Sequence, residues 1–237
     1  VETVVQGGKA FIEIIRQVLR SHHDLVIKAP AVSVGFSQAL FASLDRHLMR
    51  KCPSPVWIVN STVPMKYRRI LAAVDQDPDD APATDLNQKI LELSNSLALT
   101  ESSELHVVHA WTLFAESMYR SRLSYSDAEV DVMAGEEELA RRRWLEDLVA
   151  AHHPAIGGRE EAVEMTRKIH LVKGDAREVV PQIAEELEVD LIVMGTVGRV
   201  GVPGFFMGNT AEDILESVTC SVLAIKPSGF VSPVSLE

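Results

Sequence analysis

The sequence predicts a doubly wound α/β fold, in which helices cover both faces of a five-stranded parallel sheet, preceded by a truncated copy of the same fold. Two observations predict it. Short, nearly continuous apolar runs alternate with amphipathic helical patterns, as strands buried on both faces of a parallel sheet require. The chain also matches itself at an offset of about 166 residues, which indicates a tandem repeat.

The two copies of the repeat carry the same features in the same order. Residues 8–29 align without a gap to residues 174–195, and each segment has a glycine, a helical pattern, an aspartate and a short apolar strand. Residues 43–60 resemble residues 210–227, where a helix ends just before a cysteine and a second apolar strand follows. A chance match would not keep so many features in order.

These alignments predict the domain boundaries. Only the back half of the first copy is present, and a short segment containing a proline is typical of a linker. The expected units are the first copy at 1–60, the linker at 61–67, the complete second copy at 68–228 and a C-terminal tail at 229–237.

The second copy is expected to alternate strands and helices along its length. Its first elements are a strand at 68–77, a helix at 86–99, a strand at 105–111, a long charged helix at 127–153 and a strand at 166–174. The repeated segment then supplies two further strands and two helices, which completes the five strands of the sheet.

Composition limits the function classes. The net charge of −11 argues against general nucleic-acid binding, because a phosphate backbone requires a surplus of Lys and Arg. No apolar run approaches the roughly 20 residues that cross a bilayer. Two cysteines are too few for a disulfide framework, so we expect a reduced, cytoplasmic protein without membrane contact. The chain starts at Val1 inside a strand-like pattern (residues 1–7), so we expect further residues before it.

Small and acidic residues follow the predicted strands at the edge of the sheet where ligands bind. In a doubly wound sheet the ligand crevice lies beyond the carboxyl ends of the strands, where the strand order reverses. Asp75 ends the first strand, Ala110 ends the second and Gly195 follows the fourth. These positions predict a ligand site at this edge.

The segment after the fourth strand is typical of a phosphate site. Gly208, Asn209 and Thr210 open a predicted helix, whose first N–H groups and positive dipole end attract anions. Glycines let the backbone approach an anion closely, and Arg199 adds positive charge.

A purely structural interpretation has about equal weight. Gly195 and Gly198 would make a tight turn, and Asn209 or Thr210 would cap the helix with nothing bound. The glycine spacing matches neither the Rossmann dinucleotide motif nor the P-loop.

The spacing of the glycines nevertheless carries a family resemblance. Two residues separate Gly195 from Gly198, nine separate Gly198 from Gly208, and the small polar Asn209 follows. This pattern resembles the ATP-binding signature of the universal stress protein family. The resemblance covers about residues 66–228, and the front of the chain is similar to the tail of another copy. It implies an adenine-nucleotide-hydrolase-like fold and a role in the stress response.

The resemblance also implies which residues hold the nucleotide. It places Ala73, Asp75 and Ala110 near the adenine and ribose, Met194, Gly195 and Gly198 along the base, ribose and first phosphate, and Gly208, Asn209 and Thr210 at the outer phosphates. Asn209 departs from the serine or threonine that ATP-binding members usually carry. Asparagine donates to a phosphate but lacks the hydroxyl that also serves a metal. ATP is the implied ligand, and magnesium is left open, since the hydroxyl of the adjacent Thr210 is an alternative to the one that Asn209 lacks.

The first copy lacks these glycines. Ala29 stands where the second copy has Gly195, Val32 stands where it has Gly198, and Phe41 and Ala42 fall near Gly208 and Asn209. Their side chains fill the space that a phosphate needs. We therefore expect the first copy to bind no nucleotide in this way, and to be structural or to hold something apolar.

The remaining polar residues are expected to be structural. Neighbouring histidines rarely converge on one metal ion, so we expect no metal site. Most of the histidines are assigned to helix ends. The histidines considered are His22, His23, His106, His109, His152 and His153. His109 alone lies near the expected adenine site. Cys52 and Cys220 are expected in the core, residues 77–80 in a solvated acidic loop, and Arg141–Arg143 in pairs with glutamates four residues away.

The function expected from these residues is a cytoplasmic, non-enzymatic stress-response module that binds ATP or a related nucleotide as a sensor. No catalytic residue is assigned, because no general base or metal carboxylate pair accompanies the loop. Two alternatives stay open. One is a weak ATPase that uses Asp75 with magnesium. The other is a scaffold that binds no nucleotide and holds a metabolite or lipid-like ligand, which Asn209 and the apolar residues 201–207 favour.

The last strands of the two copies are the expected intramolecular contact. Single-domain relatives pair through their last strands, so we expect residues 56–60 and 221–226 to pair within the chain as a pseudo-dimer. A homodimer of the whole chain is left open.

Overall fold

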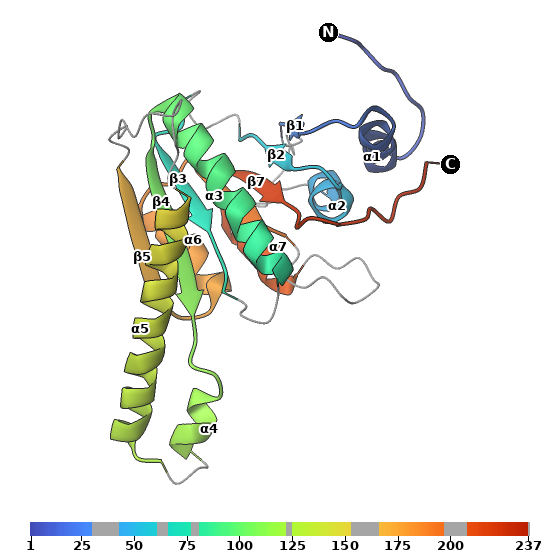
Figure 1. The fold of residues 1–237 in the computed structure, drawn as a ribbon. Coiled ribbons are helices and arrows are strands. Elements are labelled where there is room, and N and C mark those ends of the chain that lie inside the picture. The colour runs from blue at the N-terminus through green and yellow to red at the C-terminus, as the bar shows by residue number, and fades with distance from the viewer. Residues whose placement is uncertain are drawn as a thin grey trace.

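One sheet of seven strands runs through both copies of the repeat (Figure 1). The computed structural model describes residues 1–29, 43–60, 66–76, 81–121, 125–152, 166–196 and 208–236. The elements in chain order are α1 (Ala10–Ser21), β1 (Val26–Lys28), α2 (Ser43–Lys51), β2 (Val56–Ile58), β3 (Arg69–Ala73), α3 (Ala81–Glu101), β4 (Glu104–Trp111), α4 (Glu116–Ser121), α5 (Asp127–Ala151), β5 (Arg167–Lys173), α6 (Ala176–Glu186), β6 (Leu191–Gly195), α7 (Asn209–Ser217) and β7 (Ser221–Ile225).

The strand order is β1-β2-β7-β6-β3-β4-β5. The five strands of the second copy are all parallel to their neighbours, which confirms the predicted five-stranded parallel sheet. The first copy adds β1 and β2, which are parallel to each other. β2 pairs with β7 in the antiparallel direction, with Trp57 opposite Leu223, so the two last strands of the copies pair as expected.

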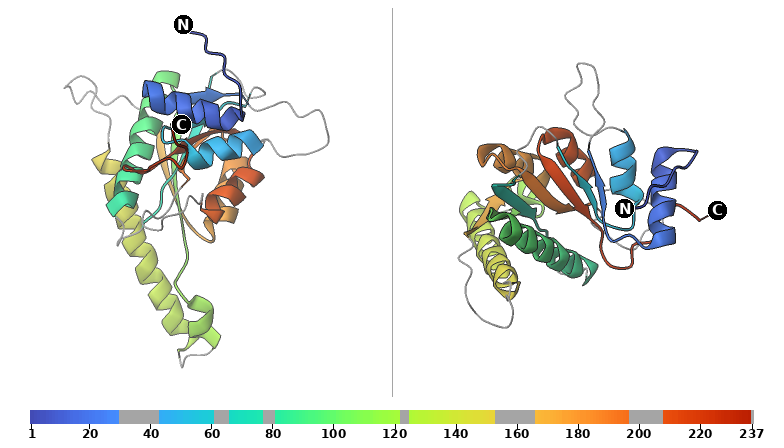
Figure 2. Two further views of the ribbon diagram at one scale, coloured as in Figure 1. Left: turned by 90° about the vertical axis from the view of Figure 1, so that its right-hand side faces the viewer. Right: turned by 90° about the horizontal axis from the view of Figure 1, so that it is seen from above.

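Helices cover both faces of the sheet, as the alternating pattern predicts (Figures 1 and 2). α3 and α5 pack on one face, where Ile90 and Leu145 meet the strands. α1, α2, α6 and α7 pack on the other face, which Ile15, Leu48 and Ile214 help to fill. No helix among the described residues is long and apolar enough to cross a membrane.

The repeat is visible in the positions of the elements. α2 and α7 begin and end about 166 residues apart, as do the start of α1 and that of α6. Gly8 and Gly174, the first glycines of the two copies, both have a positive φ, at +142° and +156°. Side chains rarely adopt this conformation, so the glycine that precedes each helix is explained by the backbone.

Three details differ from the sequence prediction. Residues 1–7 form no strand and are exposed, because an apolar pattern alone does not make a strand where no neighbouring strand is present to pair with it. The helix expected at 86–99 begins earlier, at Ala81. α4 was not predicted, because six residues are too few to show a helical period.

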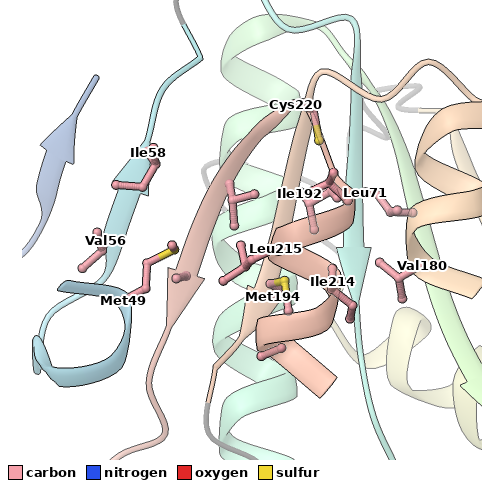
Figure 3. Close-up of a cluster of buried hydrophobic side chains, with 14 of the residues drawn as sticks. Met49, Val56, Ile58, Leu71, Val180, Ile192, Met194, Ile214, Leu215 and Cys220 are labelled. Carbon is pink, nitrogen blue, oxygen red and sulfur yellow. The ribbon is translucent and has the colours of Figure 1, made fainter. Parts of the chain in front are cut away.

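One buried core joins the two copies (Figure 3). Met49, Val56 and Ile58 of the first copy pack in the same cluster as Ile192 and Ile214 of the second. The two cysteines lie at the edges of this cluster, which confirms their expected burial; burial raises the pKa of the Cys52 thiol and raises that of Cys220 to about 12. Neither is therefore a nucleophile at neutral pH.

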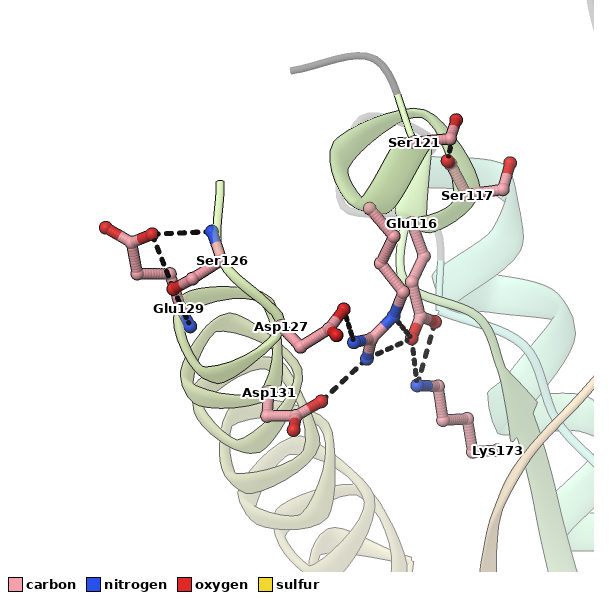
Figure 4. Close-up of polar contacts among 9 residues, drawn as sticks. Glu116, Ser117, Ser121, Ser126, Asp127, Glu129, Asp131 and Lys173 are labelled. Carbon is pink, nitrogen blue, oxygen red and sulfur yellow. Dashed lines mark hydrogen bonds and ion pairs between the residues drawn. The ribbon is translucent and has the colours of Figure 1, made fainter. Parts of the chain in front are cut away.

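The first half of α5 and the short α4 project beyond the end of the sheet (Figure 1). Ser126 and Glu129 form a capping box at the start of α5. Arg120 of α4 binds Asp131, at 2.6 Å, and Asp127, and so holds α4 along one side of α5 (Figure 4). We call this projection, residues 112–143, the α4–α5 arm.

Two of the three adjacent arginines in α5 make the expected pairs. Arg141 binds Glu137 at 2.7 Å and Arg142 binds Glu138 at 3.3 Å, each four residues away along the helix. Such exposed pairs stabilise a helix by about 0.3–0.5 kcal/mol each.

The shared core predicts that the chain unfolds as one unit. Met49 lies in the first copy and is fully buried. Met49→Ala should therefore lower the free energy of unfolding of the whole chain by about 2–5 kcal/mol, the usual cost of removing a large core side chain. Urea titrations followed by circular dichroism and by tryptophan fluorescence should give coincident transitions for both proteins.

Val231→Ala is the matched control, because Val231 is 77% exposed, and it should change stability little. Two separate transitions, with only one shifted by Met49→Ala, would show that the copies fold independently.

Candidate functional site

A cavity of about 270 Å³ lies at the carboxyl ends of β3 and β6. In the second copy the chain runs from β3 to β4 on one side, and it returns to β6 on the other. This is the place where the strand order reverses and where doubly wound sheets bind their ligands. The described part of the cavity lies just below the usual range of roughly 300–1,000 Å³ for small-molecule sites.

The structure brings together most of the residues that the sequence singled out. Those that line the cavity are Ala73, Asp75, Ala110, Met194, Gly195, Gly208 and Thr210. Asn209 is exposed and does not line it. Gly198, Arg199, the apolar residues 201–207, the acidic loop 77–80 and the first-copy positions Val32, Phe41 and Ala42 lie outside the described residues.

Helices α3 and α6 supply walls that the sequence analysis missed. Leu86, Asn87 and Ile90 come from α3, and Ala176 and Val180 come from α6. They are ordinary members of amphipathic helices, so only the packing of the helices on the sheet shows that they reach the cavity. The walls are mainly apolar, which suits a flat aromatic group.

Asn87 fixes the backbone at the end of β3. Its side-chain oxygen accepts from the N–H of Asp75 at 3.1 Å, and its side-chain nitrogen donates to the C=O of Asp75 at 2.5 Å. Both backbone groups of Asp75 are thus satisfied by one amide, where the chain has left the strand. The carboxylate of Asp75 is the one charged side chain among the described residues that line the cavity.

Gly195 allows α3 to pack closely against the end of β6. A Cβ at Gly195 would lie 2.5 Å from Cδ2 of Leu86, so any larger residue would displace that side chain. A Cβ at Gly208 would meet no atom within 4 Å, and the φ of Gly208 is an ordinary −58°. The described chain therefore gives no steric reason for a glycine at position 208.

The start of α7 has no side-chain cap. Gly208 is the N-cap residue, and no side chain accepts a hydrogen bond there. The interpretation in which Asn209 or Thr210 caps the helix is therefore wrong, because both residues already lie inside it. Within the part of the chain that the structure describes, no side chain accepts from the first N–H groups of α7, and the helix dipole makes an anion favourable there.

Thr196, directly after Gly195, closes the base of the loop that follows. Its C=O accepts from the N–H of Gly208 at 3.1 Å, so the two ends of the loop meet. Its hydroxyl donates to the C=O of Met49, the last but two residue of α2, at 3.1 Å. The first copy therefore contacts the candidate site directly through this hydroxyl.

Lys226 is buried beside the same threonine. Its Nζ donates to the C=O of Met49 at 2.5 Å and to the hydroxyl of Thr196, and lies over the ring of Phe230. Burial lowers the pKa of Lys226 to about 7; the nearby Cys52 opposes this shift and Arg50 adds to it. Burial thus brings the titration of this amine close to neutral pH.

The histidines are structural in the described chain. His109 is buried against Trp144, and its Nδ1 lies 3.2 Å from the C=O of Val74, behind the end of β3; it does not line the cavity. Nδ1 of His106 lies 2.9 Å from Nε2 of His170, a contact that no sequence pattern predicted. Burial lowers the pKa of all three imidazoles.

Two of the histidines that were expected at helix ends lie there in the structure. His22 is the C-cap of α1, and Nδ1 of His152 lies 2.8 Å from the C=O of Leu148 in the last turn of α5. His153 lies outside the described residues. Within the described ranges no group of three or more His, Cys, Asp and Glu residues is placed to hold a metal ion.

Two larger hollows lie outside the point between β3 and β6 where the strand order reverses. One, of about 580 Å³, lies between α6 and the start of β7 and includes Glu185, Glu188 and Thr219. The other, of about 550 Å³, lies under the C-terminal tail beside Pro55 and Phe230. Neither combines a helix N-terminus with strand ends, so the smaller cavity remains the candidate site.

Comparison with known proteins agrees with the fold. The model of the universal stress protein family matches residues 66–226. Universal stress protein E of Escherichia coli K12 is 33% identical over 237 residues, which cover 99% of this chain and 70% of that protein. Universal stress protein E of Photorhabdus laumondii is 27% identical over 234 residues, with 98% and 70% covered. The chain therefore belongs to the universal stress protein family.

Solved structures give the same result. A protein of unknown function from Pseudomonas aeruginosa PAO1 superposes with a TM-score of 0.71 at 25% identity, covering 93% of this chain and 69% of that one. A universal stress protein from Archaeoglobus fulgidus gives a TM-score of 0.63 at 18% identity, with 95% and 70% covered, a likeness of fold.

The buried amine of Lys226 predicts a pH dependence of stability. Its pKa is about 7 in the folded chain and 10.5 in its ordinary state, so between these values the unfolded chain binds more protons and stability rises with pH. From pH 7 to pH 10 the free energy of unfolding should rise by roughly 2–4 kcal/mol relative to that of Lys226→Met. Below pH 7 this contribution should be constant.

Urea titrations of both proteins across this range measure the difference. Comparison with the variant cancels the opposite contribution of the two buried thiols, which both proteins share. Parallel pH profiles would show that Lys226 is charged in the folded chain throughout.

Proposed function

We propose that the second copy binds ATP or a related adenine nucleotide in the cavity at the ends of β3 and β6, and that the protein acts as a non-enzymatic nucleotide sensor in the stress response. The observation that carries the proposal is the convergence on one cavity of Asp75, Gly195, Gly208 and Thr210, which come from the ends of two strands and the start of a helix. Membership of the universal stress protein family supports the nucleotide as the ligand.

Each part of the cavity suits one part of a nucleotide. The apolar surfaces of Ala73, Ala110 and Met194 would hold the adenine, and the carboxylate of Asp75 would accept hydrogen bonds from ribose hydroxyls. The uncapped start of α7 would hold phosphate oxygens through backbone N–H groups, with Thr210 beside them. Magnesium, where present, would accompany the outer phosphates rather than sit in a protein cage.

The small number of reactive groups along the described part of the cavity favours binding over catalysis. Asp75 is the one carboxylate among the described lining residues, and the buried His109 faces away from the cavity. General base catalysis requires a group within hydrogen-bond reach of the attacking water. We accordingly propose slow hydrolysis at most.

The first copy completes the proposed unit. The antiparallel pairing of β2 with β7 supports an intramolecular pseudo-dimer, in which the first copy supplies the partner that a second chain would otherwise provide. Cys52 of the first copy and Cys220 of the second copy are free thiols, and a reducing cytoplasmic setting is part of the same proposal.

Gly208→Val tests the nucleotide site most cleanly. Because a Cβ at Gly208 meets no atom of the described chain within 4 Å, the variant should fold normally, while its side chain would occupy the space of the phosphates. Calorimetric titration with ATP and magnesium should give one site per chain for the original protein. The variant should bind at least about tenfold more weakly, a loss of about 1.4 kcal/mol.

Gly7→Val is the matched control, since a Cβ at Gly7 also meets nothing within 4 Å and Gly7 lies outside the site. Nucleotide released on denaturing the purified protein would identify the natural ligand. Absence of both ATP binding and released nucleotide would refute the proposal and favour the scaffold alternative.

Asp75→Ala separates a sensor from an enzyme. If Asp75 only contacts the ribose, the variant should lose about three- to tenfold in affinity, and the slow release of phosphate at saturating ATP should be unchanged. Phosphate release by the original protein that disappears in the variant, with binding retained, would establish the weak ATPase instead.

A further inference from the structure

The outward side of α5 is apolar over about three turns. Val130 is fully buried and marks the inward side of the helix. Since an α-helix turns about 100° per residue, Ala128, Val132, Gly135 and Leu139 fall on the opposite side. All of them are exposed; Val132 is 61% exposed and Leu139 is 50% exposed. We call these four residues the outer face of α5.

Gly135 lies at the centre of the outer face. A Cβ at this position would meet no atom within 4 Å, so contacts within the described chain do not explain the glycine. A glycine inside a helix destabilises it relative to alanine, and it commonly marks a place where another backbone approaches closely. The residue is therefore suited to a helix that crosses α5 at this point.

The charges along α5 are separated into an acidic and a basic part. Residues 127–138 contain no lysine or arginine, and Arg141, Arg142 and Arg143 follow directly. The acidic residues of this part are Asp127, Glu129, Asp131, Glu136, Glu137 and Glu138. A helix with this pattern is complementary to a copy of itself that runs in the opposite direction.

The outer face matches itself in that antiparallel arrangement. With a two-fold axis passing Gly135, the glycines of the two helices face each other and Val132 lies opposite Leu139 of the second copy. Arg143 then approaches Glu129 of the second copy. A parallel arrangement would instead bring Arg142 and Arg143 of the two copies together, which is unfavourable.

On the other flank of the outer face, Arg142 also lies opposite an acidic residue of the second copy. In the antiparallel arrangement it lies near Asp131 of the second copy. On each flank of the outer face one arginine thus faces a carboxylate of the second copy, while Glu136, next to the two-fold axis, faces its own counterpart.

We propose that the outer face of α5 is a dimer interface, occupied by the outer face of α5 of a second copy of this chain in antiparallel orientation. The α4–α5 arm projects beyond the sheet, so a second copy can approach it, and α4 lies along another side of α5 and leaves the outer face exposed (Figures 1 and 4). The proposal is independent of nucleotide binding, since the outer face and the cavity share no residue.

Sedimentation velocity of the full chain over a range of concentrations tests this interface. The original protein should form a dimer as its concentration rises. Leu139→Glu and Gly135→Val should each weaken the dimer at least about tenfold, since one places a charge in the apolar contact and the other separates the backbones. Both sites are exposed, so circular dichroism and thermal unfolding should report an intact fold.

Val231→Glu is the matched control, because Val231 is 77% exposed and lies in the C-terminal tail, outside the α4–α5 arm. It should leave the dimer unchanged. Arg143→Glu should weaken the dimer at low salt, and added salt should restore part of it by screening the new repulsion with Glu129 of the second copy.

Two results would overturn the proposal. The first is a monomer at every concentration at which the protein is soluble. The second is a dimer that Leu139→Glu leaves intact, which would place the interface elsewhere, for example on the open edge of β1.

Discussion

The antiparallel pairing of β2 with β7 is the contact on which the rest of the structure depends. Each of these strands is parallel to its other neighbour, so the pairing joins two separate parallel units into one sheet. The helices of the first copy then fall on the same face as α6 and α7, and a common core forms between them. Without this pairing, β7 would be an edge strand with unpaired backbone N–H and C=O groups.

The same pairing connects the first copy to the candidate site. It places the end of α2 against the segment where β6 leaves the sheet, and the C=O of Met49 there meets both Thr196 and Lys226. A carbonyl at the end of a helix carries partial negative charge, which suits these two donors. The copy that lacks the glycine pattern thus supports the base of the loop in the copy that has it.

The fold could be predicted almost completely from the sequence because it rests on local periodicity. Strands such as β6 are continuous apolar runs, and α1 and α6 repeat their apolar residues three and four apart, so short windows suffice. Helix α4 has six residues, which are too few to show this periodicity. The strand-like residues 1–7 show the converse error, since pairing depends on a neighbour that a local pattern does not reveal.

The candidate site could be predicted only in part, because it combines local motifs with distant contacts. The strand ends and Gly208 follow from the order of elements and a known glycine pattern. The amide of Asn87 that brackets Asp75 and the burial of Lys226 do not, since a polar residue in a helix or after a strand is ordinarily exposed. Lys226 is buried by residues 30 and 177 positions away along the chain.

The outer face of α5, on the α4–α5 arm, is recognised only when the sequence and the structure are combined. The sequence alone makes Val132 and Leu139 unremarkable members of a long charged helix. The fold turns them outward, because Val130 and Leu145 occupy the side that packs inward. This side of the helix is apolar, faces solvent and has a glycine at its centre. The charges along it are complementary to those of a second, antiparallel copy, as a symmetric contact requires. The candidate cavity and the arm are therefore separate surfaces, the first determined by the ends of the strands and the second by the outward side of a helix.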